Sequence, residues 1–292
     1  MSRVENIDHA DWTAAPERDA IAAATPALEA GDVLFLPRLS FVVAANEALT
    51  LFAPSILGSS KNASFDPATG RLGGTTLAGG GAETLRTFMH RFSASAAALV
   101  ERLLPAYRDQ LIRGRASFRP AEIAGRHTSW RKDDTRLHVD SFPATPSGGR
   151  RILRVFTNVN PEGRARAWRI GDDFEAVARR FAPELRVPLR GSGTVLALLR
   201  VTKTRRSPYD ALMLQLHDRM KADEEFQKRS PQTAIDFPAG STWLAFTDQV
   251  SHAAMAGQYQ LEQTFLVPVQ AMRDEQRSPL RVLERLKGTR LT

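Results

Sequence analysis

The sequence predicts an α+β fold whose core is a double-stranded β-helix, the jelly roll of cupin-like proteins, with flanking helices. From about residue 116 onward, short β-rich segments follow one another and are separated by Pro and Gly. This pattern is typical of an antiparallel barrel or jelly roll. Apolar residues at helical spacing occur before this region and in two stretches within it, which predicts helices that flank the strands.

The region before residue 116 contains a strand, a glycine-rich segment and a long helix. Residues 31–37 are apolar, follow a turn and end at a proline, which predicts a short buried strand. Residues 70–81 are rich in glycine but lack the Lys-Ser/Thr ending of a phosphate-binding loop, so we interpret them as an ordinary flexible loop. The apolar residues of 82–104 recur at helical spacing and predict a helix that packs on the core.

The predicted core region combines strands with helical inserts. Strands are expected at 151–161, 194–199, 241–246 and 263–269. Helices are expected near 172–181 and 208–229, and the Ser-Pro pair at 207–208 marks the start of the second helix. A short basic amphipathic helix is expected after Ser278.

These elements predict one continuous structural domain with three parts. Residues 1–115 form an N-terminal helical and strand segment that packs on the core. Residues 116–270 form the jelly-roll catalytic core, with a helical insert near 172–230, and residues 271–292 form the basic C-terminal helix. A chain of 292 residues is long enough to bury a sizeable core.

Composition narrows the class of protein. The chain has 40 Lys and Arg against 32 Asp and Glu, a formal charge of +8, and most of the cations are arginines. It has no cysteine, which excludes disulfides, thiol catalysis and Cys-ligated metal sites. No apolar run approaches the roughly 20 residues of a membrane helix, and the N-terminus lacks the apolar stretch of a signal peptide. We therefore expect a cytoplasmic protein whose basic surface suits an anionic partner.

Two of the six histidines stand in patterns typical of a metal site. His138 and Asp140 form a His-x-Asp step, and His252 follows a Gly-strand-Asp run at 240–248. Alternate residues of an extended strand share a face, so His138 and Asp140 point the same way. Two imidazoles and one carboxylate suit Fe(II) and leave positions open for a bidentate 2-oxoacid and O2. We predict these three residues as the iron ligands; the alternative is a strand-end His beside an Asp that caps a turn.

A 2-oxoglutarate site also needs a buried cation for the distal carboxylate of the cosubstrate. Residues 260–265, soon after His252, contain no Arg or Lys, so we expect this cation on the strand that follows the His-x-Asp step. We predict Arg154, with Arg151 and Arg136 as alternatives. The other residues expected to bind the cosubstrate are Gln263, Thr264, Asn158 and Trp130.

The segment 128–136 lies directly before the predicted metal ligands and contains three cations, two acids and a tryptophan. We interpret it as a mouth that binds an anionic, hydroxylated substrate. A solvated loop with internal ion pairs is the alternative. The predicted substrate-binding residues are Arg131, Lys132, Arg136 and Arg151.

Two stretches carry a resemblance to a known family. Residues 128–161 and the residues around His252, with 257–259 and 262–265, resemble the Kdo hydroxylases of Gram-negative bacteria. Kdo is 3-deoxy-D-manno-oct-2-ulosonic acid, the acidic sugar that links lipid A to the core of lipopolysaccharide. The resemblance extends over nearly the whole chain, and it implies that His138, Asp140 and His252 match the iron ligands of the family.

The resemblance also implies an activity and a location. The family consists of Fe(II)- and 2-oxoglutarate-dependent dioxygenases that use O2 to hydroxylate carbon 3 of Kdo on a lipid A precursor, with release of succinate and CO2. A basic protein with such a substrate is expected to bind an anionic membrane surface peripherally, at the cytoplasmic face of the inner membrane.

Other functions stay open at this point. A 2-oxoglutarate oxygenase that acts on a different sugar or peptide is one alternative. A basic jelly-roll module that binds without catalysis is another. No nucleic-acid partner is expected, because the sequence has no helix-turn-helix, no ribonucleoprotein-type aromatic motif and no Lys-rich run. The oligomeric state does not follow from the sequence.

Overall fold

The computed structural model describes residues 1–126, 128–189 and 206–292. The strands are β1 (Val4–Asn6), β2 (Val33–Leu36), β3 (Ala63–Phe65), β4 (Leu72–Gly73), β5 (Ile112–Arg119), β6 (Arg151–Asn158), β7 (Arg166–Ile170), β8 (Thr233–Phe237), β9 (Thr242–Phe246), β10 (His252–Ala256) and β11 (Gln260–Val267). The α-helices are α1 (Arg18–Ala30), α2 (Ala45–Leu51), α3 (Gly79–Leu103), α4 (Phe174–Phe181), α6 (Pro208–Ala222), α7 (Glu224–Arg229) and α8 (Pro279–Lys287).

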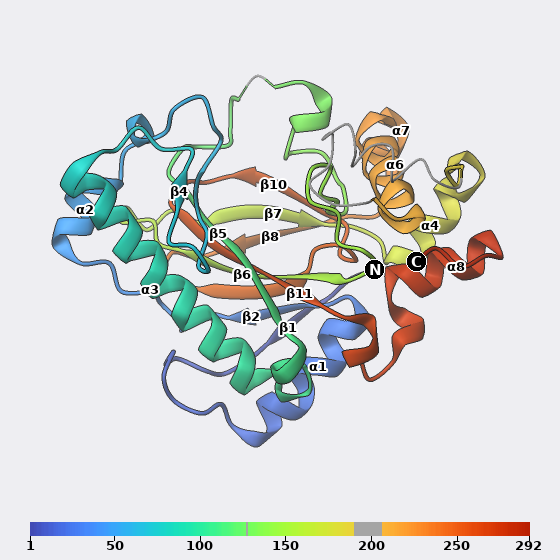
Figure 1. Ribbon diagram of the computed structural model, residues 1–292, viewed down its shortest axis with the longest axis horizontal. Helices are drawn as coiled ribbons and strands as arrows, with labels where there is room; N and C mark the ends of the chain where they lie inside the picture. Colours follow the sequence, from blue (N-terminus) through green and yellow to red (C-terminus); the bar gives the residue numbers. More distant parts are fainter. Residues whose placement is uncertain (127, 190–205) are drawn as a thin grey trace.

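The strands form a large and a small sheet (Figure 1). The large sheet has eight strands in the order β1-β2-β9-β6-β11-β5-β3-β4, and the small sheet has three in the order β10-β7-β8. Apart from the parallel pair β1 and β2, neighbouring strands are antiparallel. The centre of the large sheet is β6, which pairs with β11 along its whole length and with β9 on its other side.

Aromatic side chains fill the space between the two sheets. Phe156 of β6 lies 5.1 Å from Trp168 of β7, measured between ring centroids. Trp243 of β9 stacks on Phe237 of β8 at 4.1 Å. Residues at alternate positions of the large sheet therefore face the small sheet, as in a jelly roll. The predicted fold class, an α+β protein with a jelly-roll core and flanking helices, is confirmed.

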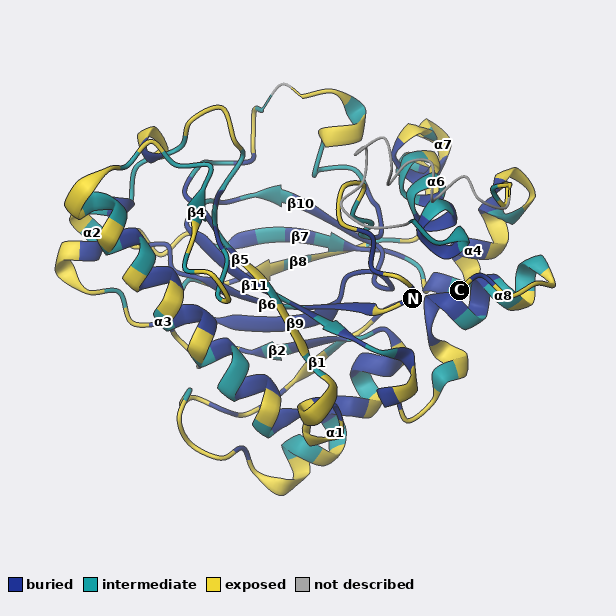
Figure 2. Ribbon diagram, in the orientation of Figure 1, coloured by how far each residue is buried: buried dark blue, intermediate teal, exposed yellow. Residues whose placement is uncertain are grey.

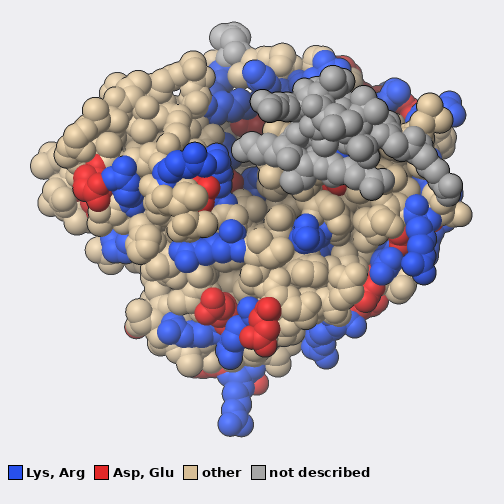
Figure 3. Space-filling model, in the orientation of Figure 1, with Lys and Arg blue, Asp and Glu red and all other residues tan. Residues whose placement is uncertain are grey.

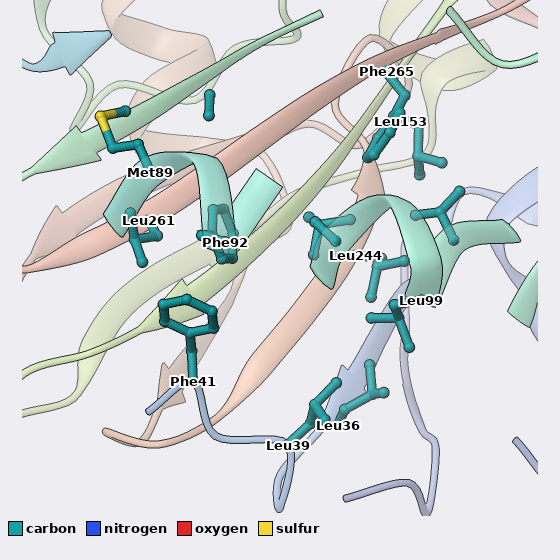
Figure 4. Close-up of a cluster of buried hydrophobic side chains, with 14 of the residues drawn as sticks. Leu36, Leu39, Phe41, Met89, Phe92, Leu99, Leu153, Leu244, Leu261 and Phe265 are labelled. Atoms are coloured by element: carbon teal, nitrogen blue, oxygen red, sulfur yellow. The ribbon is translucent and has the colours of Figure 1, made fainter. Parts of the chain in front are cut away.

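The opposite face of the large sheet is covered by α3 (Figures 1 and 4). The buried positions of this helix, among them Phe88, Phe92 and Leu99, recur three or four residues apart and form one apolar stripe. This stripe packs against Leu153 of β6 and Leu261 of β11, which lie on the face of the sheet that points away from the small sheet. The central strands β9, β6 and β11 are buried on both faces as a result, and the outer side of α3 is exposed (Figure 2).

A second group of helices lies at one end of the sheets, at the right of Figure 1. Helices α4, α6, α7 and α8 share one apolar cluster, which also contains Leu137 and Val139. These two residues flank His138, so the helices pack directly against the predicted metal-binding segment. None of the helices in the part of the chain that the structure describes is long and apolar enough to cross a membrane.

Most predicted elements are present, with some differences in their ends. The helix expected at 208–229 is interrupted at Asp223, whose side chain accepts a hydrogen bond from the Phe226 N–H and starts a new helix, α7. The glycine-rich segment 70–81 is not all loop, because it contains β4 and the first residues of α3. The strand expected at 194–199 lies outside the described residues.

Candidate metal and cosubstrate site

The residues His138 and His252 come together through their own main chains. The N–H of each donates to the carbonyl of the other, at 3.0 and 2.9 Å, and this pair forms an isolated antiparallel bridge at the start of β10. Two residues further on, the Asp140 N–H donates to the carbonyl of Thr247 at 2.7 Å. The His-x-Asp step is thereby held in extended form against the segment that carries the second histidine.

The side chains of His138, Asp140 and His252 converge at one point. One ligand atom from each residue lies within 4.8 Å of the other two. The distance between His138 Nε2 and Asp140 Oδ1 is 3.9 Å. Three ligands from one side leave the opposite side of a metal ion open, which is the donor set of a non-haem Fe(II) oxygenase.

Both imidazole rings are held in the tautomer that a metal needs. His138 Nδ1 lies 2.7 Å from the carbonyl of Arg136, and His252 Nδ1 lies 2.8 Å from the carbonyl of Val250. A carbonyl can only accept, so each Nδ1 carries the hydrogen and donates it, and each Nε2 keeps a free lone pair. The rings are further positioned by stacking, because Trp168 lies parallel to His252 at 5.1 Å.

Burial and charge favour the metal-binding forms of the three groups. Burial lowers the pKa of His138 and of His252, which keeps both rings neutral at physiological pH. Burial acts to raise the pKa of Asp140, but the Arg154 guanidinium 3.3 Å away more than offsets this and holds the pKa well below its usual value. The site therefore offers two neutral imidazoles and one carboxylate.

These three residues line a cavity between the two sheets. Its walls come from β5, β6, β7, β10 and β11, from the metal-binding segment and from Asp134. Five of its lining side chains carry buried polar atoms that have no hydrogen-bond partner. These atoms are Asp140 Oδ2, Arg154 Nε, Arg166 Nε, Trp168 Nε1 and Gln260 Oε1.

Such atoms are costly to bury, so their concentration in one cavity indicates a polar ligand. Three of the five, Arg154 Nε, Arg166 Nε and Trp168 Nε1, are N–H groups that can donate a hydrogen bond, and the other two are acceptor oxygens. A small dicarboxylate such as 2-oxoglutarate fits this set of groups, because each of its ends is an anion that accepts several hydrogen bonds.

The three arginines of the cavity differ in how their charges are paired. Arg154 contacts Asp140 and also Glu262, the latter at 3.2 Å, and Arg119 contacts Glu262 at 3.1 Å. Arg166 donates to the carbonyl of Gly257 at 2.5 Å, and no carboxylate of the described residues lies within 4.0 Å of it. Burial, together with the charge of Arg119, lowers the pKa of Arg166 to about 9. Arg166 is thus a buried cation that lacks a counter-ion, as expected of an anchor for an anionic cosubstrate.

The structure brings only part of the predicted cosubstrate residues to the cavity. Arg154 lines it, as predicted. Gln263 points to the opposite face of the sheet, where its amide contacts Ser93 of α3 and the Gly114 carbonyl. The Asn158 amide is occupied by the carbonyls of Arg164 and Phe237. Trp130 lies under the guanidinium of its neighbour Arg131, and neither it nor Thr264 lines the cavity.

The predicted substrate-binding cations have partners of their own. Arg131 contacts Asp218 at 3.2 Å and is largely exposed, and Lys132 is exposed beside it. Arg136 contacts Asp133 and Glu224. The structure does not bring Arg151 to this mouth: its side chain is fully buried and contacts Asp248 at 2.8 Å on the other side of the metal-binding segment.

Sequence reasoning missed eight residues that line the cavity. Those with polar side chains or an indole N–H that can reach a ligand are Arg119, Asp134, Arg166, Trp168, Gln260 and Glu262, and the other two are Phe156 and Ala254. The signal that was available is strand alternation: Arg166 and Trp168 share a face of β7, and Gln260 and Glu262 share a face of β11. Which face points to the metal depends on the pairing of distant strands, and local sequence does not contain that information.

The sequence of the chain matches the model of a known protein family. The family model described as 3-deoxy-D-manno-oct-2-ulosonic acid (Kdo) hydroxylase matches residues 11–290. No curated protein matches the chain. Among solved structures, the Kdo hydroxylase KdoO in complex with cobalt(II), a non-haem Fe(II) α-ketoglutarate-dependent dioxygenase, is 45% identical, with 99% of this chain and 97% of that chain covered and a TM-score of 0.95.

A second KdoO structure holds the cosubstrate. The complex with α-ketoglutarate and Fe(III) is 44% identical, with 100% of this chain and 98% of that chain covered and a TM-score of 0.95. The complex of KdoO with succinate and Fe(III) is also 44% identical, with 99% and 97% covered and a TM-score of 0.94. The similarity therefore spans the metal ligands, the cavity and the helices around them.

Proposed function

The chain belongs to the Kdo hydroxylase family, and we propose that it is an Fe(II)- and 2-oxoglutarate-dependent dioxygenase that hydroxylates Kdo. The observation that carries this proposal is the combination of two features at one place. Three convergent residues with free donor atoms line a cavity in which five buried polar atoms have no hydrogen-bond partner. When bound there, Fe(II) and 2-oxoglutarate supply the chemistry that puts one atom of O2 into a C–H bond, with succinate and CO2 as coproducts.

Metal binding, orientation of the ligands and binding of the cosubstrate would fall to different residues of the chain. His138, Asp140 and His252 would hold the metal, and the carbonyls that accept from the two Nδ1–H groups fix the direction of the rings. Arg154 keeps Asp140 ionised and oriented. Arg166 would bind the distal carboxylate of 2-oxoglutarate, because it is the cation of the cavity without a counter-ion among the described residues.

Apolar side chains form part of the cavity wall. Phe156, Trp168 and Ala254 form its apolar part, and the first two belong to the aromatic layer between the sheets. Apolar groups beside the arginines lower the local dielectric, which strengthens the contacts between the arginines and a carboxylate.

We further propose carbon 3 of Kdo on a lipid A precursor as the position modified, at an anionic membrane surface that the protein binds peripherally. The formal charge of +8 supports this, and Lys and Arg outnumber Asp and Glu on the face drawn in Figure 3. The C-terminal helix contributes less free charge than its composition indicates. Arg281 contacts Glu275 and Glu284, and Arg285 contacts Glu175.

Product analysis tests this function. The protein is incubated with Fe(II), 2-oxoglutarate, O2 and a Kdo-bearing lipid A precursor, and the lipid and succinate are quantified by mass spectrometry. We expect one oxygen atom added to Kdo and succinate in equimolar amount, with neither product from an acceptor that lacks Kdo. Oxygen on another sugar, or succinate that does not depend on Kdo, would overturn the proposal.

A further inference from the structure

One buried lysine close to the metal ligands has no role in the chemistry described above. Lys221 is only 2% exposed. Its ammonium group makes one hydrogen bond, to the main-chain carbonyl of Arg131 at 3.2 Å, although it can donate three. No carboxylate of the described ranges lies within 4.0 Å of it, so this charge is buried without a counter-ion. Buried ammonium groups are costly in this state, which indicates that an anion joins them in the working protein.

Helix α6 places this lysine next to the segment that leads to His138, because its ammonium group donates to the Arg131 carbonyl. His217 precedes Lys221 by four residues on the same helix, so the two share a face. The ring of His217 packs edge-on against the ring of His138, with centroids 5.4 Å apart. The face of α6 that carries Lys221 is therefore the face that touches a metal ligand, and neither residue lines the cosubstrate cavity.

A second ammonium group approaches the same segment from another part of the chain. Lys61 donates to the carbonyl of Lys132, next to the carbonyl that accepts from Lys221, and contacts Asp134 at 3.1 Å. Burial lowers the pKa of Lys221, and the charges of Asp134 and Asp140 act in the opposite direction. Lys61 already has a carboxylate partner, so Lys221 is the ammonium group of this pair that is left to bind an anion.

We propose that Lys221 binds the carboxylate of the sugar substrate at the outer side of the metal site. This rests on the proposed function, because it takes Kdo as the substrate. In a 2-ulosonic acid the carboxylate is carbon 1, and carbon 2 alone separates it from carbon 3. A site that hydroxylates carbon 3 must therefore hold the carboxylate close to the metal, and Lys221 lies on the face of α6 that contacts His138 through His217. A phosphate on the lipid A part of the acceptor is much further from the reacting carbon.

The test compares two lysine variants that remove the same charge. Lys221→Met removes the buried ammonium group and keeps the length of the side chain. Lys228→Met is the matched control, because Lys228 is exposed on α7 and makes no contact with the site. We expect kcat/KM for the Kdo acceptor to fall about 10- to 100-fold in Lys221→Met, mainly through KM, since hydrogen bonds to charged groups contribute about 1.5–3 kcal/mol. The control keeps the wild-type value.

A substrate variant identifies the group that the lysine binds. With an acceptor whose Kdo carboxylate is a methyl ester, wild-type protein is expected to lose as much as Lys221→Met loses with the acid. The variant is expected to lose little more with the ester, because the two changes remove the same contact. Additive losses overturn the proposal. So does a loss that disappears when the acceptor is dephosphorylated, since Lys221 then binds a phosphate.

Folding and cosubstrate binding are measured in parallel. The visible band of the anaerobic complex with Fe(II) and 2-oxoglutarate, and the Tm, are expected to stay at wild-type values or above. If Lys221→Met and Lys221→Gln both lose the band, Lys221 is a structural residue and the proposal is overturned. If wild-type protein does not hydroxylate any Kdo acceptor, the proposed function itself fails. If wild-type protein is active and the Lys221 variants have the same kcat/KM as the Lys228→Met control, the function stands and this inference fails.

Discussion

Main-chain carbonyls determine how His138 and His252 present themselves to a metal. Each ring donates its Nδ1–H to the carbonyl two residues earlier, at 2.7 and 2.8 Å, which leaves both Nε2 atoms free. The same i−2 arrangement in two unrelated segments makes the pair nearly symmetric. The ligands are therefore in place before a metal arrives, which lowers the entropic cost of binding it.

Asp140 supplies the only negative charge among the three ligands. We expect Asp140→Ala to lower succinate formation at least about 100-fold, because loss of a ligand or its support costs metal affinity and activity on that scale or beyond. Asp236→Ala, an exposed aspartate on β8, is the control. Succinate formation is measured with 2-oxoglutarate and Fe(II) in excess. Full activity in Asp140→Ala would remove this residue from the site.

Arg166 and Arg154 are expected to differ in what they support. Arg166→Met should raise the KM for 2-oxoglutarate about 10- to 100-fold and leave Fe(II) affinity unchanged, since Arg166 contacts no metal ligand. Arg154→Met should weaken both, because Arg154 lies 3.3 Å from Asp140. Equilibrium binding of each ligand separates the two effects. An unchanged affinity for 2-oxoglutarate in Arg166→Met would place the anchor elsewhere, on Arg154 or Arg119.

At the scale of elements, one buried ion pair ties β6 to the segment that leads to His252. Arg151, the first residue of β6, donates to Asp248 at 2.8 Å and to Gln249 at 2.5 Å. Its guanidinium also lies over the Phe246 ring, 3.9 Å from the centroid. Asp248 accepts in addition from the Ile152 N–H. The loop between β9 and β10 is thereby fixed to the central strand, and with it Thr247, which holds Asp140.

Stability measurements distinguish this structural role from the substrate-binding role that the sequence predicted for Arg151. Arg151→Met alone should lower the free energy of unfolding by about 3–5 kcal/mol, because Asp248 is left buried and unpaired. The double variant Arg151→Met/Asp248→Leu should lose clearly less. Urea unfolding measures both. If Arg151→Met retains wild-type stability and only the KM for the sugar rises, the substrate-binding prediction holds instead.

The regular spacing of residues along strands and helices explains which elements could be predicted from the sequence. The common direction of His138 and Asp140 was predicted from a period of two residues, and the helix at 82–104 from helical spacing. The break between α6 and α7 was missed, because apolar spacing continues through it and only the capping contact of Asp223 shows it. Gln263 was assigned to the cosubstrate, but its parity with Leu261 places it on the α3 face of β11.

For the whole molecule, the sandwich of two sheets brings the site together from distant segments. The cavity takes residues from β5, β6, β7, β10 and β11, which belong to two different sheets. The sequence was enough to predict the jelly roll and to single out His138, Asp140, His252 and Arg154, which the structure brings together at one cavity. It was not enough to predict Arg119 and Arg166, because each reaches the cavity only through the pairing and packing of strands far apart in the chain.

The account depends most on one claim, that the three convergent ligands and the arginine-lined cavity bind Fe(II) and 2-oxoglutarate together. Visible absorption under anaerobic conditions tests it directly, with purified protein titrated first with Fe(II) and then with 2-oxoglutarate. We expect a charge-transfer band that requires both additions, that is lost in His138→Ala and that needs more 2-oxoglutarate in Arg166→Met. A folded wild-type protein that binds both ligands without this band, or a band of full strength in His138→Ala, would contradict the account.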